Sequence, residues 1–357
     1  MTDPLLEQPT KRVSPLPSGQ AINIALVGYG LAGSVFHAPA IAADPDFRLH
    51  SIVTSDPQKQ AELSSRYPGT KAVASFEELP FAELDLVVLA TPPETHVRLA
   101  SAALEAGSSV VVDKPFTPTS AEGLELIAKA ERLGKLLTVF QNRRWDGEFL
   151  TLQKLLAQGA LGEVYRFESS MERWAPTISK GWKAEAKAGG GILFDLGTHL
   201  IDQALLLFGP VQHVYGELNA RRAQEPSDDD VFIALHHANG VRSHLSMNLS
   251  VAQFAPRLRV LGSEAGYLKE HGDLQEAQII DGILPGDERY GVDPEESWGL
   301  LGRTGETRRI ETERGDFPAF YALLAQSLKT GTPPPVDPLD AVAALRVIEE
   351  VRAQNGF

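Results

Sequence analysis

Cysteine is absent from this sequence of 357 residues. Its absence excludes disulfide bonds, thiolate nucleophiles and cysteine-ligated zinc sites together. Long apolar runs are also missing, since none approaches the roughly 20 residues of a membrane-spanning helix. Residues 1–20 lack the apolar segment of a signal peptide and are rich in proline, serine and mixed charge. We therefore expect a loose N-terminal tail at 1–20 and a cytoplasmic location.

Basic residues are in the minority: the sequence has 33 lysines and arginines against 47 aspartates and glutamates, which gives a net charge of −14. Such an acidic surface repels nucleic acid and anionic membranes, so neither is expected as a partner. Anionic small molecules can still bind where cations gather in one site. With 43% hydrophobic and 22% charged residues, the chain has the composition of a globular protein, and its length allows two domains with separate cores.

Residues 21–141 alternate between short apolar, β-branched runs and stretches with helical spacing. Such runs are typical of buried strands in a parallel sheet, and the helical stretches supply the crossovers between them. The pattern predicts an α/β fold whose N-terminal domain, over 21–141, is a Rossmann domain with a doubly wound parallel sheet. The predicted strands are 22–27, 48–54, 70–74, 84–90, 108–113 and 135–141.

The pattern changes after residue 141. A predicted strand at 162–173 precedes several alternating stretches, and Asn239-Gly240 marks a hairpin turn between two of them. Closely spaced strands indicate a large open, mainly antiparallel sheet. Residues 142–357 are therefore predicted to form a C-terminal α+β domain that binds the substrate. A bare sheet face of this kind often packs against a partner subunit, so we expect a homodimer or homotetramer through this domain.

A glycine-rich loop follows the first predicted strand. It lies between a strand and a helix, which is the context that a dinucleotide-binding motif requires. Its glycines permit a tight turn and a close approach of the backbone to a pyrophosphate at the helix N-terminus. An ordinary βα turn is the alternative, but the strands that follow favour dinucleotide binding. The loop consists of Gly28, Tyr29, Gly30, Leu31, Ala32 and Gly33.

The end of the second predicted strand distinguishes NAD from NADP. An NAD site usually places an acid about twenty residues past the glycines, where it binds the ribose 2′-hydroxyl. Here Thr54 and Ser55 stand at that point, with Asp56 and Lys59 after them. Small hydroxyl groups do not repel a 2′-phosphate and Lys59 would neutralise it, which favours NADP. Asp56 either turns back to the ribose, as in an NAD site, or caps the following helix.

Two polar segments follow later strands, at the edge where ligands of open parallel sheets bind. The sequence ATPPETH spans 90–96, after the fourth predicted strand, and Asp113-Lys114-Pro115 ends the fifth. A lysine in this place is either a surface side chain that covers apolar neighbours or a cation beside the nicotinamide. Its location at the switch point of the sheet favours the second interpretation.

The stretch GGGILFDLGTHLID, residues 189–202, predicts a helix with three polar side chains on one face. Asp195, His199 and Asp202 are spaced by four and three residues. A metal site, a satisfied core network and a catalytic site all fit this spacing. Oxidation of an alcohol needs a base that titrates near neutrality, as histidine does, and a cation such as Lys114 beside the developing alkoxide. We favour catalysis without a metal, and we interpret Asp202 as structural.

These motifs together resemble the Gfo/Idh/MocA family (glucose–fructose oxidoreductase, inositol dehydrogenase, rhizopine catabolism). The glycine loop, DKP at 113–115 and the stretch at 189–202 occur in that family's order. FHAP at 36–39 and NRRWD at 142–146 resemble its NADP-dependent scyllo-inositol dehydrogenase branch in particular. The resemblance implies a Rossmann domain followed by a C-terminal α/β domain, in an oxidoreductase that assembles as dimers or tetramers.

The resemblance also implies catalytic residues. Lys114 matches the lysine of the family's E-K-P motif, which contacts the reacting oxygen, although Asp113 stands where the family has glutamate. Asp195 and His199 match the family's catalytic aspartate and histidine. The three predicted catalytic residues are therefore Lys114, Asp195 and His199.

Cofactor contacts are implied in the same way. Trp182 matches a Trp-Arg pair near the nicotinamide, with Lys183 in place of the arginine. No role is assigned to His37, Arg143 or Arg144. The residues that match the family's cofactor-contacting turn T-P-x-x-x-H are Thr91, Pro92, Pro93 and His96.

Three functions are compatible with these residues. We favour an NADP-dependent dehydrogenase that acts on a secondary hydroxyl of a cyclic polyol or sugar. The first alternative is a glycosidase of the same superfamily, which uses bound NAD without net oxidation. The second is a non-catalytic regulator that senses the cofactor, but a sensor would need neither Lys114 nor His199.

Overall fold

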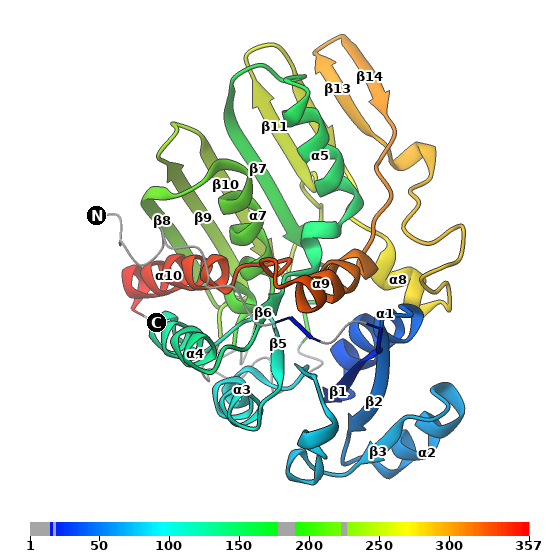
Figure 1. The fold of residues 1–357 in the computed structure, drawn as a ribbon. Coiled ribbons are helices and arrows are strands. Elements are labelled where there is room, and N and C mark those ends of the chain that lie inside the picture. Colours follow the sequence, from blue (N-terminus) through cyan, green and yellow to red (C-terminus); the bar gives the residue numbers. More distant parts are fainter. Residues whose placement is uncertain (1–14, 17–18, 178–189, 223–226, 357) are drawn as a thin grey trace. The chain divides into compact units, whose positions relative to one another are not determined.

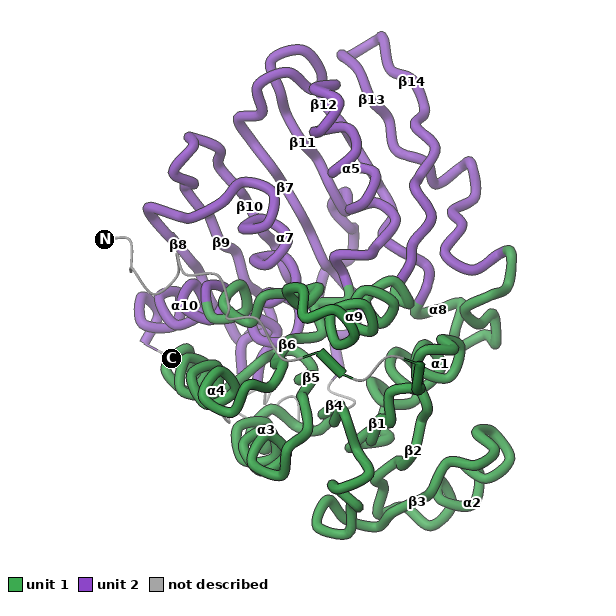
Figure 2. The backbone as a smooth tube through the Cα atoms, viewed as in Figure 1, with its two compact units in different colours: residues 1–142, 276–288, 317–342 green, residues 143–275, 289–316, 343–357 purple. Residues whose placement is uncertain are grey.

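The computed structural model describes residues 15–16, 19–177, 190–222 and 227–356 (Figure 1). None of the helices in these ranges has the length and apolar character needed to cross a bilayer. The chain divides into two compact units, which Figure 2 shows in green and purple. Unit 1 comprises Met1–Asn142, Glu276–Glu288 and Phe317–Val342, and unit 2 comprises Arg143–Gln275, Arg289–Asp316 and Ala343–Phe357.

Unit 1 is built on a six-stranded sheet in which all neighbouring strands are parallel. The order β3-β2-β1-β4-β5-β6 is that of a doubly wound Rossmann sheet, which confirms the predicted fold. The central strands are apolar and buried, as the continuous apolar runs predict. The strands are β1 (Ile22–Val27), β2 (Phe47–Val53), β3 (Lys71–Val73), β4 (Leu86–Leu89), β5 (Ser109–Asp113) and β6 (Leu137–Phe140).

The helices of unit 1 begin and end where local chemistry favours it. Thr119 accepts a hydrogen bond from the backbone N–H of Glu122 and so caps α4, which ends at Gly134 in a left-handed conformation. A π-helical segment, Ala32–His37, begins at the end of the glycine loop and continues into α1. The helices are α1 (Ala38–Ala43), α2 (Pro57–Arg66), α3 (His96–Glu105), α4 (Ser120–Leu133) and α9 (Pro318–Thr330), with α8 (Gln275–Ile280) beginning at the boundary of the unit.

The units differ from the expected division at residue 141 because two later segments belong to unit 1. The ring of Phe320 in α9 lies 4.9 Å from that of Phe140 at the end of β6, edge to face. The hydroxyl of Thr138 in β6 donates a hydrogen bond to the carbonyl of Val336 at 2.7 Å. These contacts between distant parts of the chain make α9 part of the Rossmann unit.

Unit 2 contains an eight-stranded sheet in the order β14-β13-β12-β11-β7-β10-β9-β8. Among the described strands, β7 and β10 pair in parallel and the other neighbours are antiparallel, which confirms the predicted open sheet. Gly240 forms the predicted hairpin turn with φ of 91°. The strands are β7 (Val164–Glu172), β8 (Val211–Asn219), β9 (Asp230–His237), β10 (Arg242–Asn248), β11 (Leu258–Gly262), β12 (Gly266–Lys269), β13 (Gly299–Arg303) and β14 (Glu306–Ile310).

Helices cover one face of this sheet. Along β9, Val231, Ile233 and Leu235 are buried, whereas the residues between them are partly exposed on the other face. Gly216 of β8 lets the end of α10 approach, because a Cβ there would clash with the side chain of Val351. The helices are α5 (Gly147–Ala157), α7 (Thr198–Phe208) and α10 (Pro338–Asn355), of which α10 begins in unit 1.

Candidate active site

The glycine loop has the geometry of a dinucleotide-binding turn. Gly28 has φ of 98°, and a Cβ there would clash with the carbonyl oxygen of Ala90. A Cβ on Gly33 would clash with the carbonyl oxygen of Gly28, so close packing of the turn requires both glycines. A Cβ on Gly30 would meet no atom within 4 Å. Packing therefore does not require Gly30, whereas the approach of a pyrophosphate to the backbone does.

The structure decides between the two roles of Asp56. Its carboxylate accepts hydrogen bonds from the backbone N–H groups of Gln58 at 2.9 Å and Lys59 at 3.4 Å, so it caps α2. The ammonium group of Lys59 donates to the carbonyl of Tyr29 in the glycine loop at 3.0 Å. The acid that could bind a ribose is thus engaged with its own helix, and a cation lies beside the loop.

The turn after β4 and the loop after β5 are joined by His96. Its ring is fully buried, with Nε2 2.8 Å from the carbonyl oxygen of Thr91 and Nδ1 3.0 Å from that of Pro115. The hydroxyl groups of Thr91 and Thr95 lie 2.7 Å apart and close the turn. The structure thus places His96 between two predicted binding segments, where it holds Lys114's loop against the turn.

The predicted catalytic helix begins with a π-helical segment, Leu193–Gly197, and continues as α7. Asp195 lies in the π-helical segment and is partly exposed, whereas His199 in α7 is 4% exposed. Single π-helical turns within helices occur frequently at functional sites. Such a segment also begins at the end of the glycine loop, so both predicted functional helices begin in this way.

Asp202 and the NRRWD segment hold α7 in place. Arg144 donates two hydrogen bonds to the carboxylate of Asp202, at 2.8 and 2.6 Å, and both side chains are buried. The side-chain amide of the next residue, Gln203, donates to the backbone carbonyl of Arg143 at 2.8 Å. Asp202 is therefore structural, as predicted, and Arg144 acquires a role that the sequence left open. The buried, bidentate ion pair between Arg144 and Asp202 fixes the rotation of the helix that carries His199.

Asp228 is a structural residue of this site that the sequence analysis missed. Its carboxylate accepts a hydrogen bond from the N–H of Leu193 at 2.7 Å, at the start of the π-helical segment. A Cβ on Gly191 would clash with the same carboxylate. Burial raises the pKa of Asp228 to about 6, since it outweighs the N–H groups that favour the charged form. The sequence signal was present only as one acid in the run SDDD at 227–230.

The predicted residues thus fall into two groups. The glycine loop, the end of β2, the turn at Thr91 and Lys114 lie in unit 1, whereas Asp195 and His199 lie in unit 2. Trp182 lies outside the described residues. Within the described ranges, no three histidine, aspartate or glutamate side chains gather in a way that could hold a metal ion.

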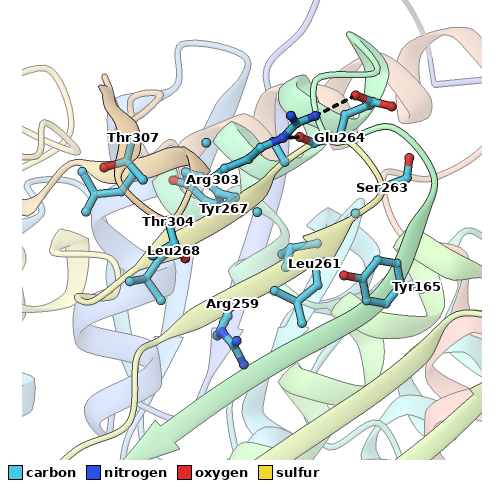
Figure 3. Close-up of a pocket in the computed structure, with 16 residues that line it drawn as sticks. Tyr165, Arg259, Leu261, Ser263, Glu264, Tyr267, Leu268, Arg303, Thr304 and Thr307 are labelled. Atoms are coloured by element: carbon cyan, nitrogen blue, oxygen red, sulfur yellow. Dashed lines mark hydrogen bonds and ion pairs between the residues drawn. The ribbon is translucent and has the colours of Figure 1, made fainter.

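A hollow of about 330 Å³ lies in unit 2, over β11, β12 and β13 (Figure 3). Tyr165 and Leu261 lie along it, and the ion pair between Arg303 and Glu264 stands at its edge (Figure 3). None of the predicted site residues that the structure describes lines this hollow. It is therefore separate from the candidate active site.

Two family descriptions match the chain. "Oxidoreductase family, NAD-binding Rossmann fold" matches residues 22–141, and "GFO/IDH/MocA C-terminal domain" matches residues 149–268. The oxidoreductase YdgJ of Escherichia coli K12, described as uncharacterized, is 39% identical over 92% of this chain and 94% of its own. The scyllo-inositol 2-dehydrogenase (NADP(+)) IolW of Bacillus subtilis is 32% identical, over 92% of each chain.

Solved structures give the same result. An oxidoreductase structure from Klebsiella pneumoniae has a TM-score of 0.85 at 37% identity and covers 94% of this chain and 95% of its own. The oxidoreductase yvaA of Bacillus subtilis has a TM-score of 0.87 at 31% identity and covers 94% of this chain and 97% of its own. The likeness spans both the Rossmann sheet and the eight-stranded sheet. This chain belongs to the Gfo/Idh/MocA family of oxidoreductases with an NAD(P)-binding Rossmann domain.

Proposed function

We propose that the protein is an NADP-dependent dehydrogenase that transfers a hydride between the nicotinamide and a secondary hydroxyl of a cyclic polyol or sugar. The proposal is supported by Lys114 directly after β5, and by Asp195 in the π-helical segment with His199 in the first turn of α7. These residue types match the needs of alcohol oxidation, and the relative IolW acts on scyllo-inositol according to its name.

Each catalytic residue has a separate task in this proposal. The nicotinamide, when bound, supplies the carbon that accepts or returns the hydride. His199 takes the proton of the substrate hydroxyl. The ammonium group of Lys114 stabilises the negative charge that develops on the same oxygen, an effect worth roughly 3 kcal/mol in comparable sites. Asp195 accepts hydrogen bonds from the substrate and orients it.

NADP is favoured over NAD by the end of β2. The carboxylate of Asp56 accepts hydrogen bonds at the N-terminus of α2, so it does not accept one from a ribose hydroxyl. Ser55 is exposed and uncharged, and the ammonium group of Lys59 lies beside the glycine loop. A 2′-phosphate in this region would meet one cation and no free carboxylate from these residues.

Replacing Ser55 with aspartate tests this preference. The added carboxylate is expected to raise the dissociation constant of NADP at least tenfold, about 1.4 kcal/mol, and to change that of NAD little. The measurement is a fluorescence titration with each reduced cofactor. Ser64→Asp, at an exposed position of α2, adds the same charge away from the loop and serves as control. Equal losses for both cofactors would contradict the NADP assignment.

The substrate class is tested by assaying reduced nicotinamide absorbance with a panel of inositols and aldoses. Oxidation of an inositol with NADP supports the proposal. A silent panel from a protein that retains its cofactor through purification would point to the glycosidase or the cofactor sensor. Release of a free sugar from glycosides, without net change in NADH, would then identify the glycosidase.

We also propose that two or four copies associate through the open face of the eight-stranded sheet. Phe232 and His244 lie with their rings 5.8 Å apart on that face, and Tyr215 is 55% exposed there. Aromatic residues on a broad sheet face suit a second copy of the same face related by two-fold symmetry. Sedimentation equilibrium measures the mass, and a monomer at micromolar concentration would contradict association. A cytoplasmic location stays a prediction from the sequence.

A further inference from the structure

Behind the loop that carries Lys114, unit 1 contains a row of polar groups that no role described above uses. His37 comes from the π-helical segment that begins at the end of the glycine loop, Asp113 from the end of β5, and Tyr321 from α9. His37 and Tyr321 are both fully buried. Burying polar side chains is costly unless they are paired with one another, so the partners of these residues matter.

The three side chains form a chain of contacts that ends at Lys114, with a hydrogen bond at each end and an electrostatic contact in the middle. The hydroxyl of Tyr321 lies 2.6 Å from Nδ1 of His37. Nε2 of His37 lies 3.7 Å from one carboxylate oxygen of Asp113, which is close enough for an electrostatic contact but too long for a hydrogen bond. The other oxygen accepts a hydrogen bond from the backbone N–H of Lys114 at 2.7 Å. The chain thus connects the helix of the glycine loop with the proposed catalytic loop.

The position of the protons follows from the groups on either side of His37. Burial, and then the charge of Asp113, raise the pKa of Tyr321 well above its usual value, so its hydroxyl keeps its proton and can donate. The carboxylate of Asp113 can only accept, so a singly protonated imidazole carries its proton on Nε2, which faces Asp113. Nδ1 then accepts a hydrogen bond from the hydroxyl of Tyr321 at 2.6 Å.

Asp113 is held as a carboxylate despite its burial. Burial alone would raise its pKa, but His37, Lys114 and His96 outweigh that effect and hold the pKa below its usual value. A carboxylate accepts the Lys114 N–H strongly and attracts the lysine's ammonium group. A protonated Asp113 would do both less well.

Aromatic rings surround the histidine and keep water away from it. The ring of Phe140 lies 4.3 Å from that of His37, and the ring of Phe47 lies 5.8 Å from that of Tyr321. In such an apolar environment electrostatic interactions between neighbouring groups are stronger than in water. The orientation of one imidazole proton therefore affects Asp113 more than it would at the surface.

We propose that Tyr321 and His37 are positioning residues of the reaction: the tyrosine sets the tautomer of the histidine, and the histidine holds the carboxylate of Asp113 where it accepts the backbone N–H of Lys114. The inference rests on the proposed function, since it assumes that Lys114 acts on the substrate oxygen. It gives the FHAP segment a role, and it makes α9 a functional part of the Rossmann unit.

The test is Tyr321→Phe, which removes one oxygen from the row. Without the hydroxyl donor, His37 can turn its lone pair toward Asp113, which then binds a proton more readily. The kcat is expected to fall about tenfold while the KM for NADP stays unchanged. Tyr267→Phe is the control, because its hydroxyl is buried in unit 2 without a hydrogen-bond partner.

Two histidine variants separate positioning from packing. His37→Gln retains an N–H that can face Asp113, so it is expected to keep more activity than His37→Leu at equal thermal stability. Equal activity of the two variants would assign His37 to packing alone and overturn the proposal.

A readout without turnover uses the imidazole nitrogen resonances of the isotope-labelled protein. His37 is expected to show a hydrogen-bonded acceptor at Nδ1 and a protonated Nε2, and Tyr321→Phe is expected to change both signals. Lys114→Ala distinguishes the role of Lys114 from the positioning role of Tyr321 and His37. If it lowers turnover while a folded Tyr321→Phe keeps the wild-type kcat and imidazole signals, only the present inference fails. If Lys114→Ala leaves turnover intact, Lys114 has no part in the reaction and the present inference fails with it. The proposed function itself fails if the unmodified protein oxidises no polyol or sugar with NADP.

Discussion

Replacing Lys114 with alanine is expected to lower kcat at least a hundredfold, by roughly 3 kcal/mol, and to leave the dissociation constant of NADP nearly unchanged. The reason is that negative charge develops on the substrate oxygen only during the reaction. The substrate hydroxyl is neutral before reaction, so a cation beside it gains most as the oxygen becomes an alkoxide. An interaction made mainly in the transition state affects kcat and kcat/KM together and ground-state binding little.

The kcat is measured with the best substrate of the panel, and cofactor affinity is measured by titration. Lys71→Ala is the matched control, since this lysine is 60% exposed and pairs with the exposed Glu83 at 3.6 Å. The control is expected to keep the wild-type kcat. Wild-type turnover in Lys114→Ala would remove this lysine from the mechanism, and a large loss of NADP affinity would make it a cofactor ligand.

The architecture could be predicted from the sequence because its signals are local. Continuous apolar runs such as that at Ile22–Val27 indicate strands buried on both faces, and the alternation in Asp230–His237 indicates a sheet with one exposed face. The placement of α9 could not be predicted in this way. It depends on aromatic contacts such as Phe140 with Phe320, which join residues far apart in the chain and leave no periodic pattern.

The candidate site shows the same division between local and long-range information. The glycine loop and the polar residues at 195–202 were predicted because their spacing is itself a geometric signal. Asp56 remained ambiguous, because a residue that precedes proline at a helix start and one that binds a ribose look alike in a sequence. Asp228 was missed because its role depends on one backbone N–H, that of Leu193, 35 residues away. The chain from Tyr321 to Asp113 was invisible for the same reason.

Replacing His199 with asparagine is expected to lower kcat by about a hundredfold to ten-thousandfold, the range for loss of a general acid–base group. Asparagine is chosen because it is similar in size and polar, so the buried position in α7 keeps most of its packing. Without the base, the proton leaves to water or hydroxide, and the remaining rate is expected to rise with pH across the range where the wild-type rate has levelled off.

The comparison needs a histidine that is not part of the site. His271 is exposed in unit 2, and His271→Asn removes the same functional group without touching α7. The control is expected to keep the wild-type kcat and pH profile. If His199→Asn keeps the wild-type profile with a lower kcat, then His199 orients the substrate and another group removes the proton. If its kcat is unchanged, the polar face of this helix serves the core, which was one of the alternatives that the spacing of Asp195, His199 and Asp202 left open.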